Sequence, residues 1–364
     1  MAFQGKFSKN YTAPPIYTST NYYRDDAIVQ LRFGYSRANN PNTDLLETRL
    51  GEIFNSDVVS YSSGSAAVLA AFFLYKPARV WIEHSNIDAI PAFKFISKIF
   101  PVEIKILPKA SEFRLASLDF QEKANELIWV ELLSLSTGRL SDYYELVKGG
   151  AFAGFKVAAD ASYCPPPFSF PLKQGFDIAI YSKADVILGP NAPNSGFATV
   201  NSLDQAEKLN YNRTLMGPVL GNLDAWNSIR CLKTYALRSQ SQSETTREVF
   251  RWLKGESWTA IKDAYASDLS MMKSYLPPII SIQFYSNEHA KKASATFNLL
   301  SSRANKFGNT SEMKISPLVS SEVGICRLEI GLEDLDVLKS NLALSFNELT
   351  FHSNGSSLNL TSKL

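Results

Sequence analysis

Short apolar runs that alternate with helical patterns through the first two hundred residues constrain the fold more than any other feature of the sequence. The seven runs lie at 57–61, 79–83, 102–107, 127–133, 155–160, 177–182 and 195–200. Helical patterns separate several of them, one beginning at Ser65 and another spanning about 87–99. Alternation of strands with helices is typical of a parallel sheet covered by helices. The sequence therefore predicts one large α/β domain.

A second, smaller domain is predicted in the last third of the chain. From 221 to 254, apolar residues recur at intervals of three and four without a proline, which predicts one long connecting helix. Beyond it, strand-like runs at 279–286 and 326–332 and helical patterns at 287–304 and from 334 predict an α+β unit. The predicted arm, large domain, connecting helix and small domain span 1–50, 51–220, 221–254 and 255–364.

The charge balance excludes a class of partners. The chain has 37 lysines and arginines against 35 aspartates and glutamates, a net charge of +2, and no block of like charges. A chain of this kind has no electrostatic footprint for nucleic acid or an anionic membrane. We expect its partners to be small molecules or other protein chains.

The cysteines and the hydropathy exclude further classes. Cys164, Cys231 and Cys326 are the only cysteines, without CxxC spacing, and the three histidines are scattered, so neither a disulfide framework nor a metal site is expected. No uncharged apolar run reaches 18 residues, and the first 15 residues contain no apolar signal segment. The sequence predicts a soluble, cytoplasmic protein.

Six segments, taken together, resemble one known family. They are APPIYTST (13–20), YSRANNPNTDLLE (35–47), SSGSAA (62–67), PLKQGFD (171–177), LDAWNSIRCLKTYALR (223–238) and RLEIGLED (327–334). In this order and at this spacing they resemble the Cys/Met-metabolism (trans-sulfuration) family of pyridoxal-phosphate enzymes. That family includes cystathionine γ-synthase, the cystathionine lyases and methionine γ-lyase.

The resemblance implies a fold, a cofactor and a kind of ligand. The implied fold is type I of the pyridoxal-phosphate-dependent transferases: an N-terminal arm, a large domain with a mostly parallel seven-stranded sheet, and a small C-terminal α+β domain. The implied cofactor is pyridoxal 5'-phosphate, and the implied substrate or ligand is an amino acid. The strand and helix patterns predict the same two-domain arrangement independently.

The phosphate end of the implied site lies at SSGSAA. This segment joins a strand to a helix, and the free N–H groups and positive dipole of a helix N-terminus hold phosphate well. Gly64 and Ser65 match the family's phosphate cradle, although a serine-capped helix start also explains the segment. Tyr35 and Arg37 match the YSR motif, which in the family reaches the cofactor phosphate of the neighbouring subunit. The resemblance therefore implies a homodimer or homotetramer.

Two further residues match positions at the other end of the site. Asp160 ends the run FKVAAD and matches the aspartate that pairs with the pyridine nitrogen, which keeps the ring an electron sink. Arg327 matches the arginine that binds the α-carboxylate of the substrate, although a surface or interface arginine is the alternative.

The residue that carries the family's chemistry is replaced. The family motif Ser-x-Thr-Lys supplies the Schiff-base lysine. Counting from Pro171 without a gap places its serine at Ser182, so the lysine position holds Asp185, which cannot form an imine. Lys183 is the alternative, because two residues along a strand keep a side chain on one face and move it roughly 6.6 Å. A strand-end Lys183 and a turn or cap role for Asp185 remain open.

Other ring-end positions also depart from the family. The stacking tyrosine falls in HSNIDAI, where His84 is the nearest ring. The asparagine expected after WVE falls near Leu135, and the expected glycine pair reads Gly308 and Asn309. Phosphate-end and scaffold positions are kept, whereas the proton-transfer position and the ring-end positions other than Asp160 are not.

Three functions fit this pattern. One is a degenerate family member that has lost its reaction, a pseudoenzyme that acts alone or as the non-catalytic subunit of a mixed oligomer with an active paralogue. Another is an active C–S lyase or γ-synthase that uses Lys183. The last is a binding protein that holds the cofactor or an amino acid noncovalently through residues such as Gly64, Ser65, Asp160 and Arg327.

Overall fold

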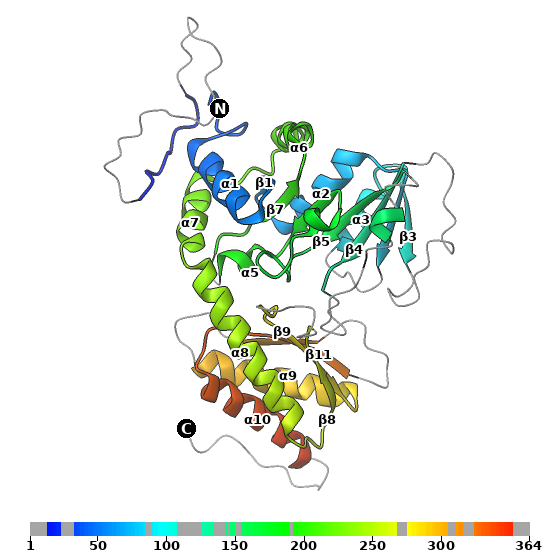
Figure 1. Ribbon diagram of the computed structural model, residues 1–364, viewed down its shortest axis with the longest axis vertical. Coiled ribbons are helices and arrows are strands. Elements are labelled where there is room, and N and C mark those ends of the chain that lie inside the picture. The colour runs from blue at the N-terminus through cyan, green and yellow to red at the C-terminus, as the bar shows by residue number, and fades with distance from the viewer. Residues whose placement is uncertain are drawn as a thin grey trace, which may run out of the picture.

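The computed structural model describes residues 13–22, 33–83, 89–107, 125–133, 143, 146–149, 154–189, 192–267, 275–304, 311–315 and 324–351. Two sheets organise this part of the chain (Figure 1). They confirm the predicted fold class, a mostly parallel sheet with a separate, smaller antiparallel sheet.

The larger sheet has seven strands in the order β1-β7-β6-β5-β4-β2-β3. Its strands are β1 (Asp57–Tyr61), β2 (Arg79–Glu83), β3 (Glu103–Leu107), β4 (Glu126–Glu131), β5 (Lys156–Asp160), β6 (Ile178–Tyr181) and β7 (Gly196–Val200). Only β7 runs antiparallel to its neighbours β1 and β6; the other pairs are parallel. Every residue of β4, β6 and β7 is buried, as expected for apolar runs covered on both faces.

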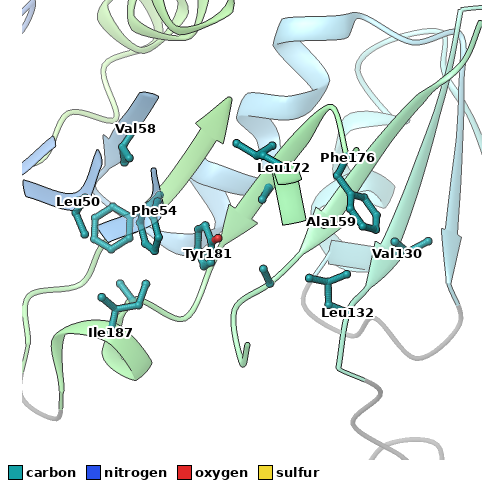
Figure 2. Packing of buried hydrophobic residues seen from close by; sticks show 14 of the residues in the cluster. Leu50, Phe54, Val58, Val130, Leu132, Ala159, Leu172, Phe176, Tyr181 and Ile187 are labelled. Atoms are coloured by element: carbon teal, nitrogen blue, oxygen red, sulfur yellow. The ribbon is translucent and has the colours of Figure 1, made fainter. Parts of the chain in front are cut away.

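Helices cover both faces of this sheet. The helices of this part are α1 (Pro41–Phe54), α2 (Gly64–Tyr75), α3 (Ala89–Ile96), the 3₁₀ helix η3 (Pro171–Gln174), α5 (Ala184–Leu188) and α6 (Leu203–Met216). One apolar cluster joins α1 and α5 to the sheet, and the rings of Phe54 and Tyr181 stack there with centroids 4.5 Å apart (Figure 2). A second cluster, with Phe93 against Trp129, joins α2, α3 and α6 to the other face.

The predicted long connecting helix is two helices. These are α7 (Asn222–Leu232) and α8 (Tyr235–Gly255). At the junction the N–H groups of Lys233 and Thr234 bond to carbonyls three residues back, which tightens the last turn of α7 and ends it without a proline. Periodicity alone did not reveal this break, because apolar spacing continues across it.

The smaller sheet is antiparallel, in the order β10-β11-β9-β8. Its strands are β8 (Ile261–Tyr265), β9 (Ile279–Phe284), β10 (Glu312–Ile315) and β11 (Gly324–Glu329). Its helices are α9 (Asn287–Ala304) and α10 (Leu335–Phe351), which pack with α8 around a third apolar cluster. The sequence did not predict β8 and β10, because both are short and interrupted by charged residues.

The cysteines and helices bear on two other predictions. All three cysteines are free, and Cys164 and Cys326 are buried. Among the described residues, none of the helices combines the length and hydropathy needed to span a membrane. The cytoplasmic location stays a prediction.

Candidate functional site

The start of α2 is fitted against the segment that follows β6. Ser63 caps the helix, its Oγ accepting the Ala66 N–H at 3.2 Å. A Cβ added to Gly64 would overlap the carbonyl oxygen of Ser182 and lie 2.8 Å from its carbonyl carbon. Only glycine permits this approach, which brings Ser182 against the N-terminus of α2.

A cavity of about 460 Å³, here called the cradle cavity, opens at this contact. Its lining residues are mostly small: Ser63, Gly64, Ser65, Val68, Ser182, Lys183, Ala184, Asp185, Ala192, Pro193, Asn194 and Ser195. Gly64 and Ser65, the first residues of α2, line it, and the N–H groups and positive dipole end of a helix N-terminus suit a phosphate. The cradle cavity therefore fits the phosphate end of the expected cofactor.

Ser162 links the cradle cavity to the end of β5, a role that the sequence did not reveal. Its N–H and Oγ donate to Asp160 Oδ1, at 3.1 and 2.6 Å. The same Oγ accepts the Ser182 N–H at 2.7 Å and lies 2.9 Å from Ser182 Oγ. Two predicted site residues, Asp160 and Ser182, are thus joined through one buried hydroxyl.

The strand predicted at 177–182 does not continue into residues 183–189, although these include the apolar run at 186–188. The strand β6 ends at Tyr181, Lys183 is the N-cap of α5, and Asp185 is exposed in its first turn. The side chain of Arg238 fixes α5 by donating Nη2 to Ile187 O at 2.7 Å. The argument that Lys183 reaches the lysine position by a two-residue shift along a strand is therefore wrong, because no strand continues beyond Tyr181.

A second cavity, of about 160 Å³, lies between the two sheets and is here called the inter-sheet cavity. Its lining residues come from both: Tyr163, Asp185, Val186, Gly189, Arg238, Gln242, Pro278, Ile279, Glu312, Glu329, Ile330 and Gly331. Asp185 lines both cavities. Lys183 lines the cradle cavity and is not among the described residues that line the inter-sheet cavity. Asp185 therefore stands at the junction of the two.

Arg327 is buried on β11, beside the inter-sheet cavity. Its Nη2 lies 2.8 Å from Glu329 Oε1, and its guanidinium carbon lies 4.7 Å from the centroid of the Tyr163 ring. Burial by itself lowers the pKa of Arg327, but Tyr163, Glu329 and Glu131 together raise it above its ordinary value. The side chain is a fixed cation.

The remaining predicted residues lie apart from the cavities or outside the described residues. Tyr35, 42% exposed, precedes α1 with Arg37 stacked 5.3 Å from its ring centroid, and neither lines the two cavities. The positions where the family pattern breaks, His84, Leu135, Gly308 and Asn309, lie outside the described residues. In the part of the chain that the structure describes, no group of three or more His, Cys, Asp or Glu side chains is arranged to hold a metal ion.

Comparisons with known proteins agree on one family. The family model described as Cys/Met metabolism PLP-dependent enzyme matches residues 3–347. A chloroplastic cystathionine beta-lyase from Arabidopsis thaliana is 24% identical over 367 aligned positions, which cover 91% of this chain and 76% of that protein.

Solved structures share the fold. The structure of metB from Corynebacterium glutamicum superposes with a TM-score of 0.82 at 20% identity, covering 92% of this chain and 93% of that one. A putative O-acetylhomoserine (thiol)-lyase from Campylobacter jejuni, solved with a pyridoxyl-lysine monophosphate, superposes with a TM-score of 0.81 at 18% identity. The superposition covers 93% of this chain and 96% of that one.

Proposed function

Because the chain belongs to the Cys/Met-metabolism family of PLP-dependent enzymes, we propose that it is a degenerate member, which holds pyridoxal phosphate by its phosphate and not through a lysine. The observation that carries the proposal is the place of Asp185. It is the residue that the ungapped count assigns to the Schiff-base lysine, and it borders both the cradle cavity and the inter-sheet cavity.

The residues present fit one end of the cofactor better than the other. The N-terminus of α2 and the close approach of Gly64 to Ser182 suit a phosphate. When bound in an enzyme of this family, the cofactor supplies an electron sink for a carbanion at the Cα of an amino acid. In this chain Ser162 binds Asp160, the residue that the resemblance assigns to the pyridine nitrogen, while Asp185 offers a carboxylate where an amine is needed.

Borohydride reduction followed by peptide mass mapping tests the proposal. The wild-type chain, loaded with pyridoxal phosphate, should release all of the cofactor on unfolding after reduction. Asp185→Lys should retain it covalently at position 185, because that amine would stand between the two cavities. Lys183→Ala is the matched control and should leave cofactor binding unchanged. Reduced cofactor found on Lys183 of the wild-type chain would contradict the proposal.

An active C–S lyase or γ-synthase that uses Lys183 is the second candidate. It is favoured by one observation: Lys183 lines the cradle cavity with Gly64, Ser65 and Ser182. This candidate requires turnover of cystathionine or an activated homoserine by the wild-type chain. It also requires that Lys183→Arg abolish that turnover while Lys183→Ala regains part of it with added alkylamine.

A non-catalytic subunit of a mixed oligomer is a form of the first proposal. The exposure of Tyr35 and Arg37 supports it, since both are available to a neighbouring subunit, of the same chain or of an active paralogue. Co-expression with a paralogue, followed by native mass spectrometry, should give a mixed species. Arg37→Ala should lower turnover by the paralogue in that species and leave the paralogue's own homo-oligomer unaffected.

A further inference from the structure

Four charged side chains lie on one face of the smaller sheet, in a row of two cations and a row of two carboxylates. In the antiparallel pair of β10 and β11, Lys314 stands opposite Arg327 and Glu312 opposite Glu329. Residues two apart on a strand share a face, so two cations and two carboxylates lie together. Lys314 Nζ bonds to Glu312 Oε2 at 2.9 Å and lies 3.4 Å from Glu329 Oε2.

Glu329 is held from three directions. Its Oε1 accepts from Arg327 Nη2 at 2.8 Å and from the Tyr163 hydroxyl at 3.4 Å, and its Oε2 faces Lys314. Tyr163 follows β5 of the larger sheet, so the Glu329 carboxylate also bridges the two sheets. A carboxylate with both oxygens engaged keeps its position.

Glu329 also stands between Arg327 and open space. Glu329 lines the inter-sheet cavity, and Arg327 is not among the described residues that do so. The face of the guanidinium is stacked on Tyr163, and the Arg327 Nε is buried without a hydrogen-bond partner in the described chain. A ligand entering the cavity therefore meets the Glu329 carboxylate before it reaches Arg327.

We propose that Glu329 is an internal substitute for a ligand carboxylate, which occupies Arg327 and makes the site reject α-amino carboxylates. An arginine binds a carboxylate through its planar fork of donors. Here Glu329, on the same strand, takes the Nη2 donor of that fork, and a carboxylate approaching the other donors would meet repulsion from Glu329. The inference rests on the proposed function only in placing Arg327 at the site, and it deepens that proposal by naming the ligand class that is excluded.

Isothermal calorimetry with L-alanine and with ethylamine tests this inference. L-alanine carries the carboxylate, and ethylamine is the same skeleton without it. In Glu329→Ala the affinity for L-alanine should rise about 10- to 100-fold, the value of a hydrogen bond to a charged group, while that for ethylamine stays constant. Glu312→Ala is the matched control, because it removes a carboxylate from the same cavity and face without freeing Arg327.

Several results would overturn the inference. One is equal affinity of the wild-type chain and Glu329→Ala for L-alanine. Another is a rise in the affinity of Glu312→Ala for L-alanine as large as that of Glu329→Ala. The third is a rise in the affinity of Glu329→Ala for ethylamine as large as that for L-alanine. If circular dichroism finds Glu329→Ala unfolded, Arg327→Gln decides: its affinity for L-alanine should equal that of the wild-type chain, and a loss overturns the inference. The two proposals can fail separately. Binding of L-alanine to Arg327 in the wild-type chain would contradict the inference about Glu329 and leave the proposal about Asp185 unaffected. Covalent attachment of the cofactor to Lys183 after borohydride reduction would contradict only the proposal about Asp185.

Discussion

The cradle cavity and the inter-sheet cavity meet at Asp185 but are built from different parts of the chain. The cradle cavity is formed by the backbone at the start of α2 and by small residues, and it depends on the close backbone approach at Gly64. The inter-sheet cavity is formed by side chains, several of them charged, such as Glu312, Glu329 and Arg238.

This difference gives a physical reason for the predicted pattern, in which the phosphate end of the site matches the family and the ring end departs from it. Backbone N–H groups and a helix dipole are present whatever the neighbouring side chains are, so an anion site of this kind persists through extensive substitution. A site made of side chains can change its charge and its ligand with a single replacement, as we propose for Asp185. The two cavities should therefore respond differently to substitution.

The largest expected effect comes from adding one carbon to the cradle cavity. Gly64→Ala should lower the free energy of unfolding by about 3 kcal/mol, because the new Cβ meets backbone atoms of Ser182 that cannot move aside. Binding of pyridoxal phosphate should be lost with it. Urea unfolding and a spectroscopic titration measure the two effects.

Gly255→Ala is the control for that substitution. Gly255 ends α8, and no heavy atom lies within 4 Å of an added Cβ. The free energy of unfolding of Gly255→Ala should therefore differ from that of the wild-type chain by less than about 0.5 kcal/mol. If Gly64→Ala were as stable as the control and still bound the cofactor, the cradle cavity would not depend on the backbone contact.

More of the cradle cavity than of the inter-sheet cavity could be predicted from the sequence, for a physical reason. Gly64 and Ser182 are each marked by a local signal, a serine cap at a strand-to-helix turn and the end of an apolar strand, and the family resemblance assigns both to one site. The pairing of Glu329 with Lys314 depends on the register of β10 against β11, and β10 was not predicted at all. Local patterns find what neighbouring residues build, and miss what the pairing of distant strands brings together.

The same limit explains the errors made within elements. The residues after Tyr181 have strand-like composition, but Ile187 and Leu188 are buried by folding back as α5 under the sheet. Ser162 joins Asp160 to Ser182 only because β5 and β6 are adjacent strands. Both features follow from tertiary packing, which overrides local preference.

The next largest effect is expected where the two cavities are connected. Ser162→Ala removes the hydroxyl that donates to Asp160 and accepts from the Ser182 N–H, leaving both buried groups short of a partner. The free energy of unfolding should fall by about 2 kcal/mol. Ser169→Ala, which removes a buried hydroxyl with one side-chain partner, Gln174, should cost about half as much. Equal losses in urea unfolding would mean that Ser162 does not link the cavities.

A smaller, pH-dependent effect distinguishes the two faces of the smaller sheet. Cys326 neighbours Arg327 on β11 and so faces the apolar side, where burial raises the pKa of its thiol to about 12 from 9.0. A raised pKa in the folded state adds stability that is complete below pH 9 and is lost as the pH rises toward 12. Between pH 8.5 and 10 the wild-type chain should therefore lose about 1 kcal/mol more than Cys326→Val. If the free energy of unfolding in urea fell equally with pH in the wild-type chain and in Cys326→Val, the thiol would be in contact with solvent.

The smallest effect, visible in rates and not in stability, reports whether the contact between the sheets opens. Cys164 packs with Tyr163 and Ile279, which line the inter-sheet cavity, and burial raises the pKa of its thiol well above the ordinary value. At pH 8 iodoacetamide should modify the partly exposed Cys231 first and leave Cys164 as slow as Cys326, because a buried thiol is neither accessible nor ionised. Peptide mass mapping over time gives the three rates. Modification of Cys164 at the rate of Cys231, with Cys326 still protected, would mean that the two sheets separate at the inter-sheet cavity. The contact of Glu329 with Tyr163 would then not keep the sheets together.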